Sequence, residues 1–123
     1  MMRVAIVDDD PIVCSSLSTI LKATGTADIA WTAYDGETAV GQYEEDTPDV
    51  LLIDVQMPVM DGYEATSKIR AMHRTDSDIP IFALTANAFV SDIGKAQSVG
   101  MNDHVSKPID MERLTDILEQ WIG

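Results

Sequence analysis

Carboxylates follow two short apolar runs, at positions where parallel strands would bring them together. Asp8 and Asp9 follow residues 4–7, and Asp54 follows residues 50–53. If these runs are adjacent strands, three carboxylates surround one small volume at the carboxyl edge of a sheet, where such folds bind ligands. Two unit charges about 5 Å apart repel by roughly 3 kcal/mol at an effective dielectric of about 20, so the cluster predicts a bound cation.

The chemistry of these ligands indicates which cation. Oxygen-only ligands favour Mg²⁺, Mn²⁺ or Ca²⁺ over zinc, and a sparse site completed by waters and a phosphate suits Mg²⁺ best. No cluster of His or Cys competes with the acids, and their spacing is not that of an EF-hand loop. The sequence therefore predicts a magnesium site that includes Asp8, Asp9 and Asp54.

Side chains at two other predicted strand ends add the remaining parts of a phosphoryl-transfer site. Lys107, directly before Pro108, can reach back toward phosphate oxygens. Thr85 ends another apolar run, and the small Ala86 beside its hydroxyl leaves space for an entering phosphoryl group. A carboxylate nucleophile, a metal, a cation and a hydroxyl donor are what this chemistry needs.

Short apolar runs alternate with amphipathic stretches along the whole chain, and these are the elements that would position the site. The alternation predicts an α/β fold, a doubly wound five-stranded parallel sheet with five helices, because each parallel crossover needs its own helix. Asp10 before Pro11 is expected to be only a helix cap. The predicted strands are residues 4–7, 29–33, 50–53, 79–84 and 104–105, and the predicted helices are residues 11–24, 37–44, 62–72, 87–99 and 111–121.

Composition restricts the classes of function. The 123 residues fit one domain, residues 1–123, and 46% hydrophobic residues are typical of a globular protein. The formal charge of −13 disfavours nucleic acid or an anionic membrane as a direct partner. The start of the chain resembles neither a signal peptide nor a membrane span, and the single Cys14 cannot form an internal disulfide, so we expect a cytoplasmic protein. A larger parent protein is compatible with these features.

Four sequence blocks, VAIVDDDP, LLIDVQMPVMDG, ALTANA and GMNDHVSKPI, together resemble the bacterial response-regulator receiver domain. The resemblance covers essentially the whole chain, with each block at a predicted strand end. It implies a flavodoxin-like sheet of strand order 2-1-3-4-5. The last block also resembles receivers fused to hybrid histidine kinases, whereas a start directly at the first strand fits a free-standing regulator or the N-terminal half of a two-domain one. The sequence leaves this choice open.

The resemblance implies roles for the acidic residues. Asp54 would be the phosphorylated residue and a direct ligand of Mg²⁺. Asp9 would also bind the metal directly, and Asp8 largely through water. Gln56 would contribute its backbone carbonyl as a further ligand.

The resemblance also implies a switch. Thr85 and Lys107 match the hydroxyl and the lysine that hold the phosphoryl oxygens. His104 matches an aromatic position that turns inward when the threonine moves, and the usual residue there is Tyr or Phe. Imidazole is smaller and titrates near neutral pH, which puts the usual readout of the switch in doubt. Gln56 and Asn87, each two positions past a site residue, are expected to tune hydrolysis of the phosphoryl group.

A receiver of this kind is a phosphoacceptor of a two-component phosphorelay and not an enzyme proper. The resemblance implies that the donor is phosphohistidine of a sensor histidine kinase or a histidine phosphotransfer protein. Docking is expected near Ser15, Ser18 and the turn at Pro108 and Ile109. The face made by helix four, strand five and helix five would change on phosphorylation and contact an output domain or a second copy.

Two other functions were weighed against the switch. An aspartate-nucleophile phosphatase would place a second acid two residues after Asp54, where Gln56 stands. A constitutive interaction domain that keeps the fold without switching is mildly favoured by His104. The complete set of acids, with Thr85 and Lys107, favours the switch.

Some residues have plainer interpretations. Cys14 is expected to be an exposed or half-packed residue of the first helix, and not a nucleophile. Asp61 and Gly62 are interpreted as a turn, and His73 as a surface residue. Trp121 is placed in the buried stripe of the last helix. Taken singly, Lys107 is also compatible with a solvated lysine and Thr85 with a strand terminator.

Overall fold

The computed structural model describes residues 2–72, 79–86 and 90–122. The strands are β1 (Arg3–Val7), β2 (Asp28–Ala33), β3 (Val50–Asp54), β4 (Ile81–Thr85) and β5 (Asp103–Ser106). The helices are α1 (Pro11–Ala23), α2 (Gly36–Glu45), α3 (Gly62–Arg70), α4 (Val90–Ser98) and α5 (Met111–Ile122). His73 and the predicted start of the fourth helix at Asn87 lie outside the described residues.

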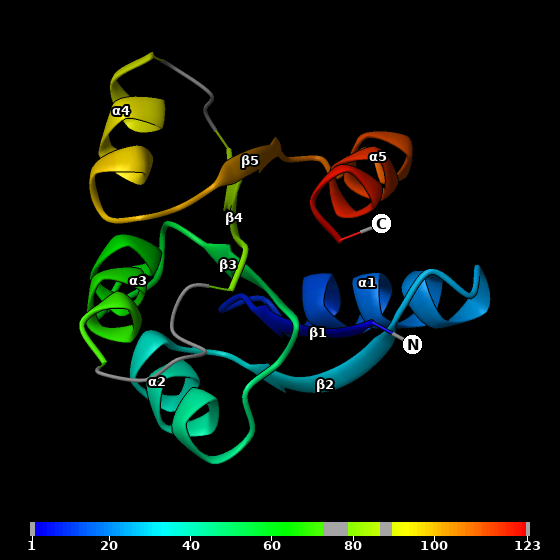
Figure 1. Cartoon of the computed structure of the whole chain (residues 1–123), viewed down its shortest axis with the longest axis horizontal. Coiled ribbons are helices and arrows are strands. Elements are labelled where there is room, and N and C mark those ends of the chain that lie inside the picture. The colour runs from blue at the N-terminus through cyan, green and yellow to red at the C-terminus, as the bar shows by residue number, and fades with distance from the viewer. Residues whose placement is uncertain (1, 73–78, 87–89, 123) are drawn as a thin grey trace.

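The five strands form one parallel sheet in the order β2-β1-β3-β4-β5, which confirms the predicted topology. Helices α2, α3 and α4 cover one face of the sheet, and α1 and α5 cover the other (Figure 1). The register places Val7 opposite Ile53, and Thr85 opposite Ser106. The carboxyl ends of the strands therefore share one edge, and the loops that follow them meet there.

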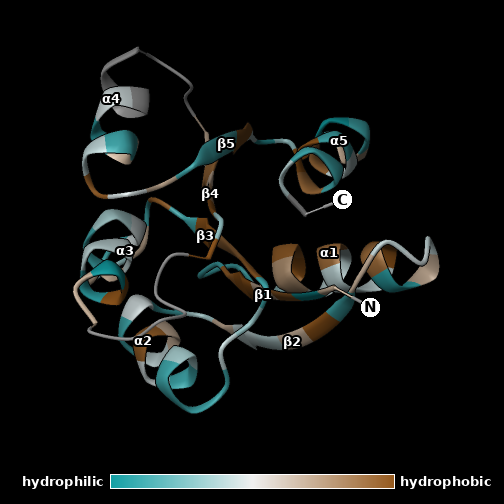
Figure 2. Cartoon of the chain, viewed as in Figure 1, coloured by the Kyte–Doolittle hydropathy of each residue, from teal (hydrophilic) through white to brown (hydrophobic). Residues whose placement is uncertain are grey.

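Apolar side chains of the strands pack against the helices on both faces of the sheet and stabilise the two helical layers. Every residue of β3 and β4 is buried, as expected for parallel strands covered on both faces. Brown, apolar residues dominate β1 and β3 in Figure 2, whereas the edge strand β5 is largely hydrophilic. One apolar cluster lies under α2, α3 and α4, and a second lies under α1 and α5.

Aspartates determine where several helices begin. Asp10 caps α1 by accepting a hydrogen bond from the Ile12 amide, as predicted. Asp35 and Asp61 cap α2 and α3 in the same way. The interpretation of Asp61 and Gly62 as a plain turn was therefore incomplete, because an Asp-Gly pair opens each of these helices.

Two predictions about burial were wrong. Cys14 is only 1% exposed, because its side chain points under the sheet edge, where the thiol donates to the carbonyl oxygens of Asp8 and Ala33 at 3.6 and 3.9 Å. Burial, followed by the nearby charge of Asp8, raises the pKa of this thiol to about 11. Trp121 is 42% exposed, because it lies in the last turn of α5 and packs mainly on Phe82, with ring centroids 6.1 Å apart.

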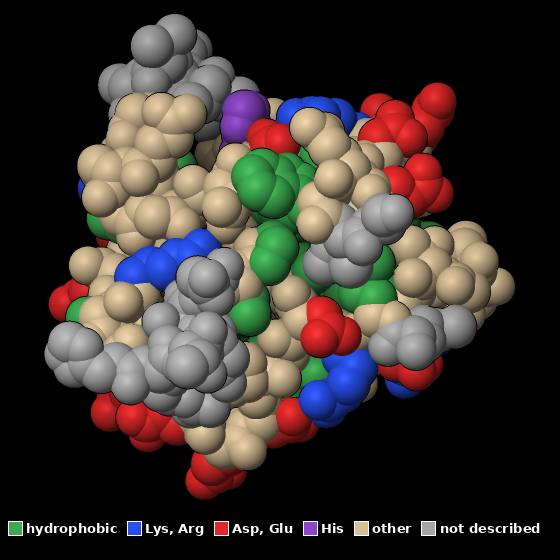
Figure 3. All heavy atoms as spheres, viewed as in Figure 1, with side chains coloured by type: hydrophobic (Ala, Val, Ile, Leu, Met, Phe, Trp, Pro, Cys, Tyr) green, Lys and Arg blue, Asp and Glu red, His purple; other side chains and the backbone are tan. Residues whose placement is uncertain are grey.

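The surface reflects the acidic composition. On the face shown in Figure 3, acidic side chains lie along the margins and few basic ones separate them, in keeping with the charge of −13. Within the part of the chain that the structure describes, no helix is long and apolar enough to cross a membrane.

Candidate functional site

Three carboxylates meet at the carboxyl edge of the sheet, as the sequence predicts. Asp8 and Asp9 directly follow β1, and Asp54 is the last residue of the adjacent β3. One carboxylate oxygen from each lies within 4.8 Å of the others. Asp8 and Asp54 are buried, whereas Asp9 is exposed, so the group is open to solvent on the side of Asp9.

Asp8 is held by two donors. The Asp10 amide donates to Oδ1 at 2.9 Å, and the Lys107 ammonium donates to Oδ2 at 2.7 Å. Burial lowers the pKa of Lys107, but its hydrogen bond to Asp8 and the charges of Asp54 and Asp8 outweigh this and raise it. The ammonium therefore stays charged beside the cluster and offsets part of the repulsion between the acids.

Asp54 is also held by a backbone amide and Lys107, but its contact with the lysine is longer than that of Asp8. Its Oδ1 accepts a hydrogen bond from the Gln56 amide at 3.0 Å, and its Oδ2 lies 3.4 Å from the Lys107 ammonium. Burial, with a smaller contribution from the charge of Asp8, raises the pKa of Asp54 to about 6, against the lowering effects of Gln56 and Lys107. A partly desolvated carboxylate of this kind remains mostly ionised near neutral pH, which suits a nucleophile.

Close backbone packing positions Asp54 from the side of α3. A Cβ atom at Gly62 would lie 2.3 Å from the Asp54 carbonyl oxygen, so only glycine allows this approach. The Gly62 amide donates to the Val55 carbonyl at 3.3 Å and joins the two ends of the intervening loop. From the sequence, Asp61 and Gly62 were interpreted only as a turn, and no packing role was assigned to Gly62.

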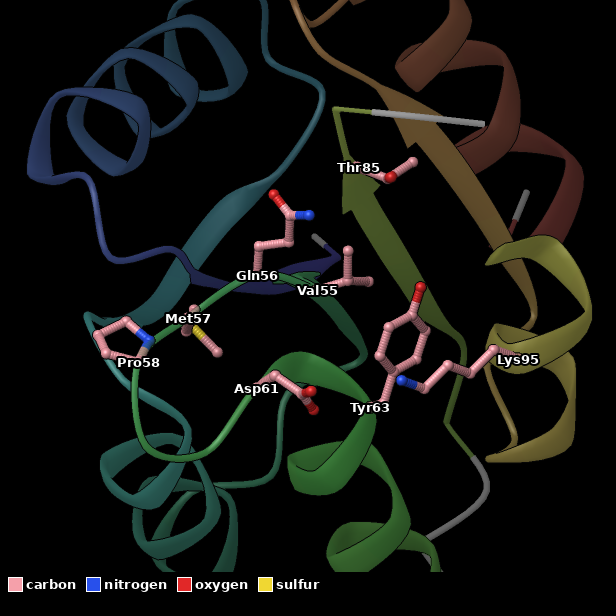
Figure 4. Close-up of a pocket in the computed structure, with 8 residues that line it drawn as sticks. All are labelled: Val55, Gln56, Met57, Pro58, Asp61, Tyr63, Thr85 and Lys95. Carbon is pink, nitrogen blue, oxygen red and sulfur yellow. The ribbon is translucent and has the colours of Figure 1, made fainter. Parts of the chain in front are cut away.

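A cavity of about 530 Å³ opens beside this site (Figure 4). Thr85 lies on its wall at the end of β4, and Gln56 lies on the wall formed by the loop after β3. Ala86, the next residue after Thr85, is exposed. Lys95 of α4 also lines the cavity, with its ammonium 4.5 Å from the centre of the Tyr63 ring. Neither Lys95 nor Tyr63 was singled out from the sequence, because a cation–π contact between two helices has no local pattern.

The residues present fit a magnesium ion. All three side chains offer oxygen, the donor type that Mg²⁺ prefers, and they converge from two strands without a nitrogen or sulfur ligand in the group. The Lys107 ammonium, which bonds both buried acids, shows that this position already requires positive charge.

His104 lines a different cavity from the one beside Asp54. It belongs to β5 at the edge of the sheet and pairs with Ala83, and its Nδ1 lies 3.7 Å from the Asp103 carboxylate. Its side chain is 27% exposed, so the structure places it part-way between the surface and the interior. Asn87, the other residue expected near the site, lies outside the described residues.

The sequence of the chain matches the family described as the response regulator receiver domain over residues 4–119. The chain belongs to this receiver family. A regulatory switch is therefore the class of activity that applies, and the role of the receiver is that of a phosphoacceptor in two-component signalling.

Two sequence relatives differ in how much of their length matches this receiver. It is 37% identical to the two-component response regulator ORR41 of Oryza sativa subsp. japonica, over 98% of this chain and 94% of that protein. It is also 37% identical to the sensor protein GacS of Pseudomonas syringae pv. syringae, over 98% of this chain but only 13% of that protein. The receiver thus spans nearly all of one relative and a small part of the other.

Solved structures show the same fold. The receiver domain of sensor histidine kinase PA1611 from Pseudomonas aeruginosa PAO1, with a magnesium ion coordinated in its active site cleft, has a TM-score of 0.84 and 36% identity, over 99% of this chain and 98% of that one. The receiver domain of Ssk1 in complex with the histidine phosphotransfer protein Ypd1, from Saccharomyces cerevisiae, has a TM-score of 0.85 and 27% identity, over 98% of this chain and 88% of that one.

Proposed function

We propose that Asp54 is the residue that accepts the phosphoryl group, and that residues 1–123 act as one receiver unit. The observation that carries this proposal is the position of Asp54: a buried carboxylate, with a pKa raised to about 6, beside two other acids and one lysine at the open edge of the sheet. Among the acids of the group it is the one closest in character to a nucleophile, because it is buried, unlike Asp9, and its 3.4 Å contact with Lys107 is longer than the 2.7 Å contact of Asp8.

Asp8, Asp9 and Asp54 would hold Mg²⁺ together with the backbone carbonyl of Gln56. Bound there, the ion neutralises negative charge on the phosphoryl oxygens. Its ligands are preorganised by the chain itself, since Asp8 is fixed by two hydrogen bonds and Asp54 by the Gln56 amide. The receiver of PA1611, with magnesium in its cleft, supports this assignment.

In the proposed reaction Asp54 is the nucleophile, and Lys107 and Thr85 hold the phosphoryl oxygens. An Asp54 carboxylate oxygen attacks phosphorus of a phosphohistidine, the phosphorus–nitrogen bond breaks, and its electron pair returns to the imidazole of the donor. Lys107, now 3.4 Å from Asp54, moves its ammonium onto a phosphoryl oxygen, and the Thr85 hydroxyl donates to another. Ala86 leaves room for the group, and Gln56 and Asn87 tune its later hydrolysis by water.

The output of the switch follows from the place of Thr85. Displacement of Thr85 toward the phosphoryl group would shift the neighbouring β5, which pairs with β4 from Phe82 to Thr85. His104 on β5 would then change its packing, together with the face made by α4, β5 and α5. An output domain or a second copy of the chain would read this face.

The donor is a sensor histidine kinase or a histidine phosphotransfer protein, and the Ypd1–Ssk1 complex supports the second. The expected docking residues are accessible: Ser15 and Pro108 are exposed, and Ser18 and Ile109 are partly exposed. In this proposal the chain is located in the cytoplasm, because it must react with such donors.

A phosphatase with an aspartate nucleophile is the competing activity. It would require a second acid two residues after Asp54, and Gln56 occupies that place. The backbone amide of Gln56 donates a hydrogen bond to the Asp54 carboxylate. A constitutive interaction domain would not need the buried charges of Asp8 and Asp54, which are costly to keep without a purpose.

One experiment separates the three functions. The protein is incubated with acetyl phosphate and Mg²⁺, and intact mass and peptide mapping are used to locate a phosphoryl adduct that base and hydroxylamine remove. We expect an adduct on Asp54 that needs Mg²⁺ and is lost in Asp54→Asn. Rapid hydrolysis of small phosphoesters without an adduct would favour the phosphatase. Absence of any adduct, with no spectral response to beryllofluoride, would favour the constitutive domain.

A further inference from the structure

The loop that joins β3 to α3, residues 55–61, is fixed at both ends and in the middle. The bond from the Gly62 amide to the Val55 carbonyl joins its ends. Within it, the Met60 amide donates to the Pro58 carbonyl at 2.8 Å across the single residue Val59, which forms a γ-turn. Val59 has a φ of 69° and is fully exposed, so this β-branched residue holds the turn without the support of buried contacts.

The middle of this loop rests on the first residue of α2. A Cβ atom built at Gly36 would lie 2.7 Å from the Met60 carbonyl oxygen and 2.9 Å from Met60 Cγ. Real Cβ atoms do not approach other atoms so closely, so a side chain at this position would displace Met60. Met60 is also partly buried against the core under α2 and α3, which limits where it can go.

The conformation of Gly36 does not itself require glycine. Its φ lies outside the left-handed region, and alanine is the better helix former at an unhindered position. Gly41 in the same helix shows the contrast, because a Cβ atom there would meet nothing within 4 Å. The approach of Met60 is therefore the feature of the structure that accounts for glycine at position 36.

The residues between Met60 and the site can absorb little of a displacement of Met60. Pro58 has a fixed φ, and Met57 is 8% exposed and anchored in the core. Gln56 comes immediately before them, and Val55 separates it from the end of β3 (Figure 4). A shift of the Met60 carbonyl has only Met57, Pro58 and Val59 in which to be absorbed before it reaches Gln56.

We propose that Gly36 is a positioning residue of the metal site. By admitting the Met60 carbonyl against α2, it sets the course of residues 55–57 and hence the position of the Gln56 carbonyl. This inference rests on the proposed function, in which that carbonyl is a ligand of Mg²⁺. The paired Asp-Gly starts of α2 and α3 then act together: Gly36 seats the middle of the loop, and Gly62 seats its end against Asp54.

The test compares Gly36→Ala with Gly41→Ala in the full chain. Isothermal titration calorimetry with Mg²⁺ alone gives the dissociation constant of Mg²⁺. Backbone amide NMR spectra of the Mg²⁺-free proteins report on residues 55–61. We expect Gly36→Ala to weaken Mg²⁺ binding about tenfold, within the range for outer partners of metal ligands, and to shift the amides of the loop. Gly41→Ala should leave both unchanged.

A second variant approaches the contact from the other side. Met60→Ala removes the side chain that seats the loop against Gly36 and should also weaken Mg²⁺ binding several-fold. A Gly36→Ala protein that loses stability but keeps the wild-type dissociation constant within twofold overturns the inference. If Gly36→Ala does not fold, a folded Met60→Ala protein with wild-type affinity does the same. Failure of the wild type to bind Mg²⁺ would instead count against the proposed function.

Discussion

Replacing Asp54 by asparagine should stabilise the Mg²⁺-free receiver while abolishing its response to Mg²⁺. Asparagine keeps the shape of the side chain and an oxygen for the Gln56 amide, but it removes a buried charge that lies with Asp8. A pKa of about 6, against the ordinary value of 3.8, corresponds to roughly 3 kcal/mol at about 1.4 kcal/mol per pH unit. Water reaches the site from one side and screens the repulsion, so we expect about 1.5 kcal/mol.

The sign of the effect gives a characteristic pH dependence. Folding raises the pKa of Asp54, so protonation of this group favours the folded state. Its contribution to stability is fully present below the unfolded value of about 3.8 and is lost as the pH rises through about 6. The difference between Asp54→Asn and the wild type should therefore be small near pH 4 and reach its full size above about pH 6.5.

Thermal unfolding in EDTA and in Mg²⁺ measures both effects. In EDTA at pH 7 we expect Asp54→Asn to melt about 5 °C above the wild type, from the entropy of unfolding of a domain of this size. Mg²⁺ should raise the melting temperature of the wild type only. Asp9→Asn is the matched control, because Asp9 is an exposed member of the same group: it should lose the Mg²⁺ response without the gain in EDTA. Equal melting temperatures of wild type and Asp54→Asn across pH 4 to 8 would refute the proposed repulsion.

Three further substitutions test other contacts. Thr66→Val should raise the free energy of unfolding by about 1 kcal/mol in urea titration, because the buried Thr66 hydroxyl has no hydrogen-bond partner among the described residues; a loss of stability would show that the hydroxyl is needed. Lys107→Met should lower it by about 2 kcal/mol in EDTA, since Asp8 is left buried without its cation, and should also slow phosphorylation by acetyl phosphate; unchanged stability would contradict the pairing. Arg70→Gln should cost about 1.5 kcal/mol, because the guanidinium bonds the Gly100 carbonyl twice, at 3.0 and 2.8 Å; melting at the wild-type temperature would show that this link is not stabilising.

The alternation of apolar runs and helical stretches was enough to predict the architecture. A run such as residues 50–53 is too short and too uniformly apolar for anything but a strand covered on both faces, and the structure confirms it. The strand order came from the resemblance to the receiver family, since periodicity does not say which strands are adjacent. The positions of Asp8, Asp9 and Asp54 then followed, because the carboxyl ends of neighbouring parallel strands lie at one edge.

What the sequence could not provide were contacts that depend on the exact course of the chain. Cys14 was expected near the surface because helical spacing alone does not show how α1 is rotated against the sheet, and it is buried. The hydrogen bond of Lys107 to Asp8, 99 residues away along the chain, was not predicted. A pairing between such distant residues has no local pattern, although both residues were selected individually.

The glycines that open α2 and α3 show the same limit most clearly. From the sequence, Asp35-Gly36 and Asp61-Gly62 are equivalent pairs, and each is compatible with a turn or a helix start. Only the structure distinguishes them, by the carbonyl that each glycine admits: that of Met60 at Gly36 and that of Asp54 at Gly62. Both carbonyls belong to the segment that carries Asp54 and Gln56, the proposed phosphoacceptor and the proposed metal ligand. The chemistry of the site therefore depends on residues that have no side chain, and a search for reactive groups could not have found them.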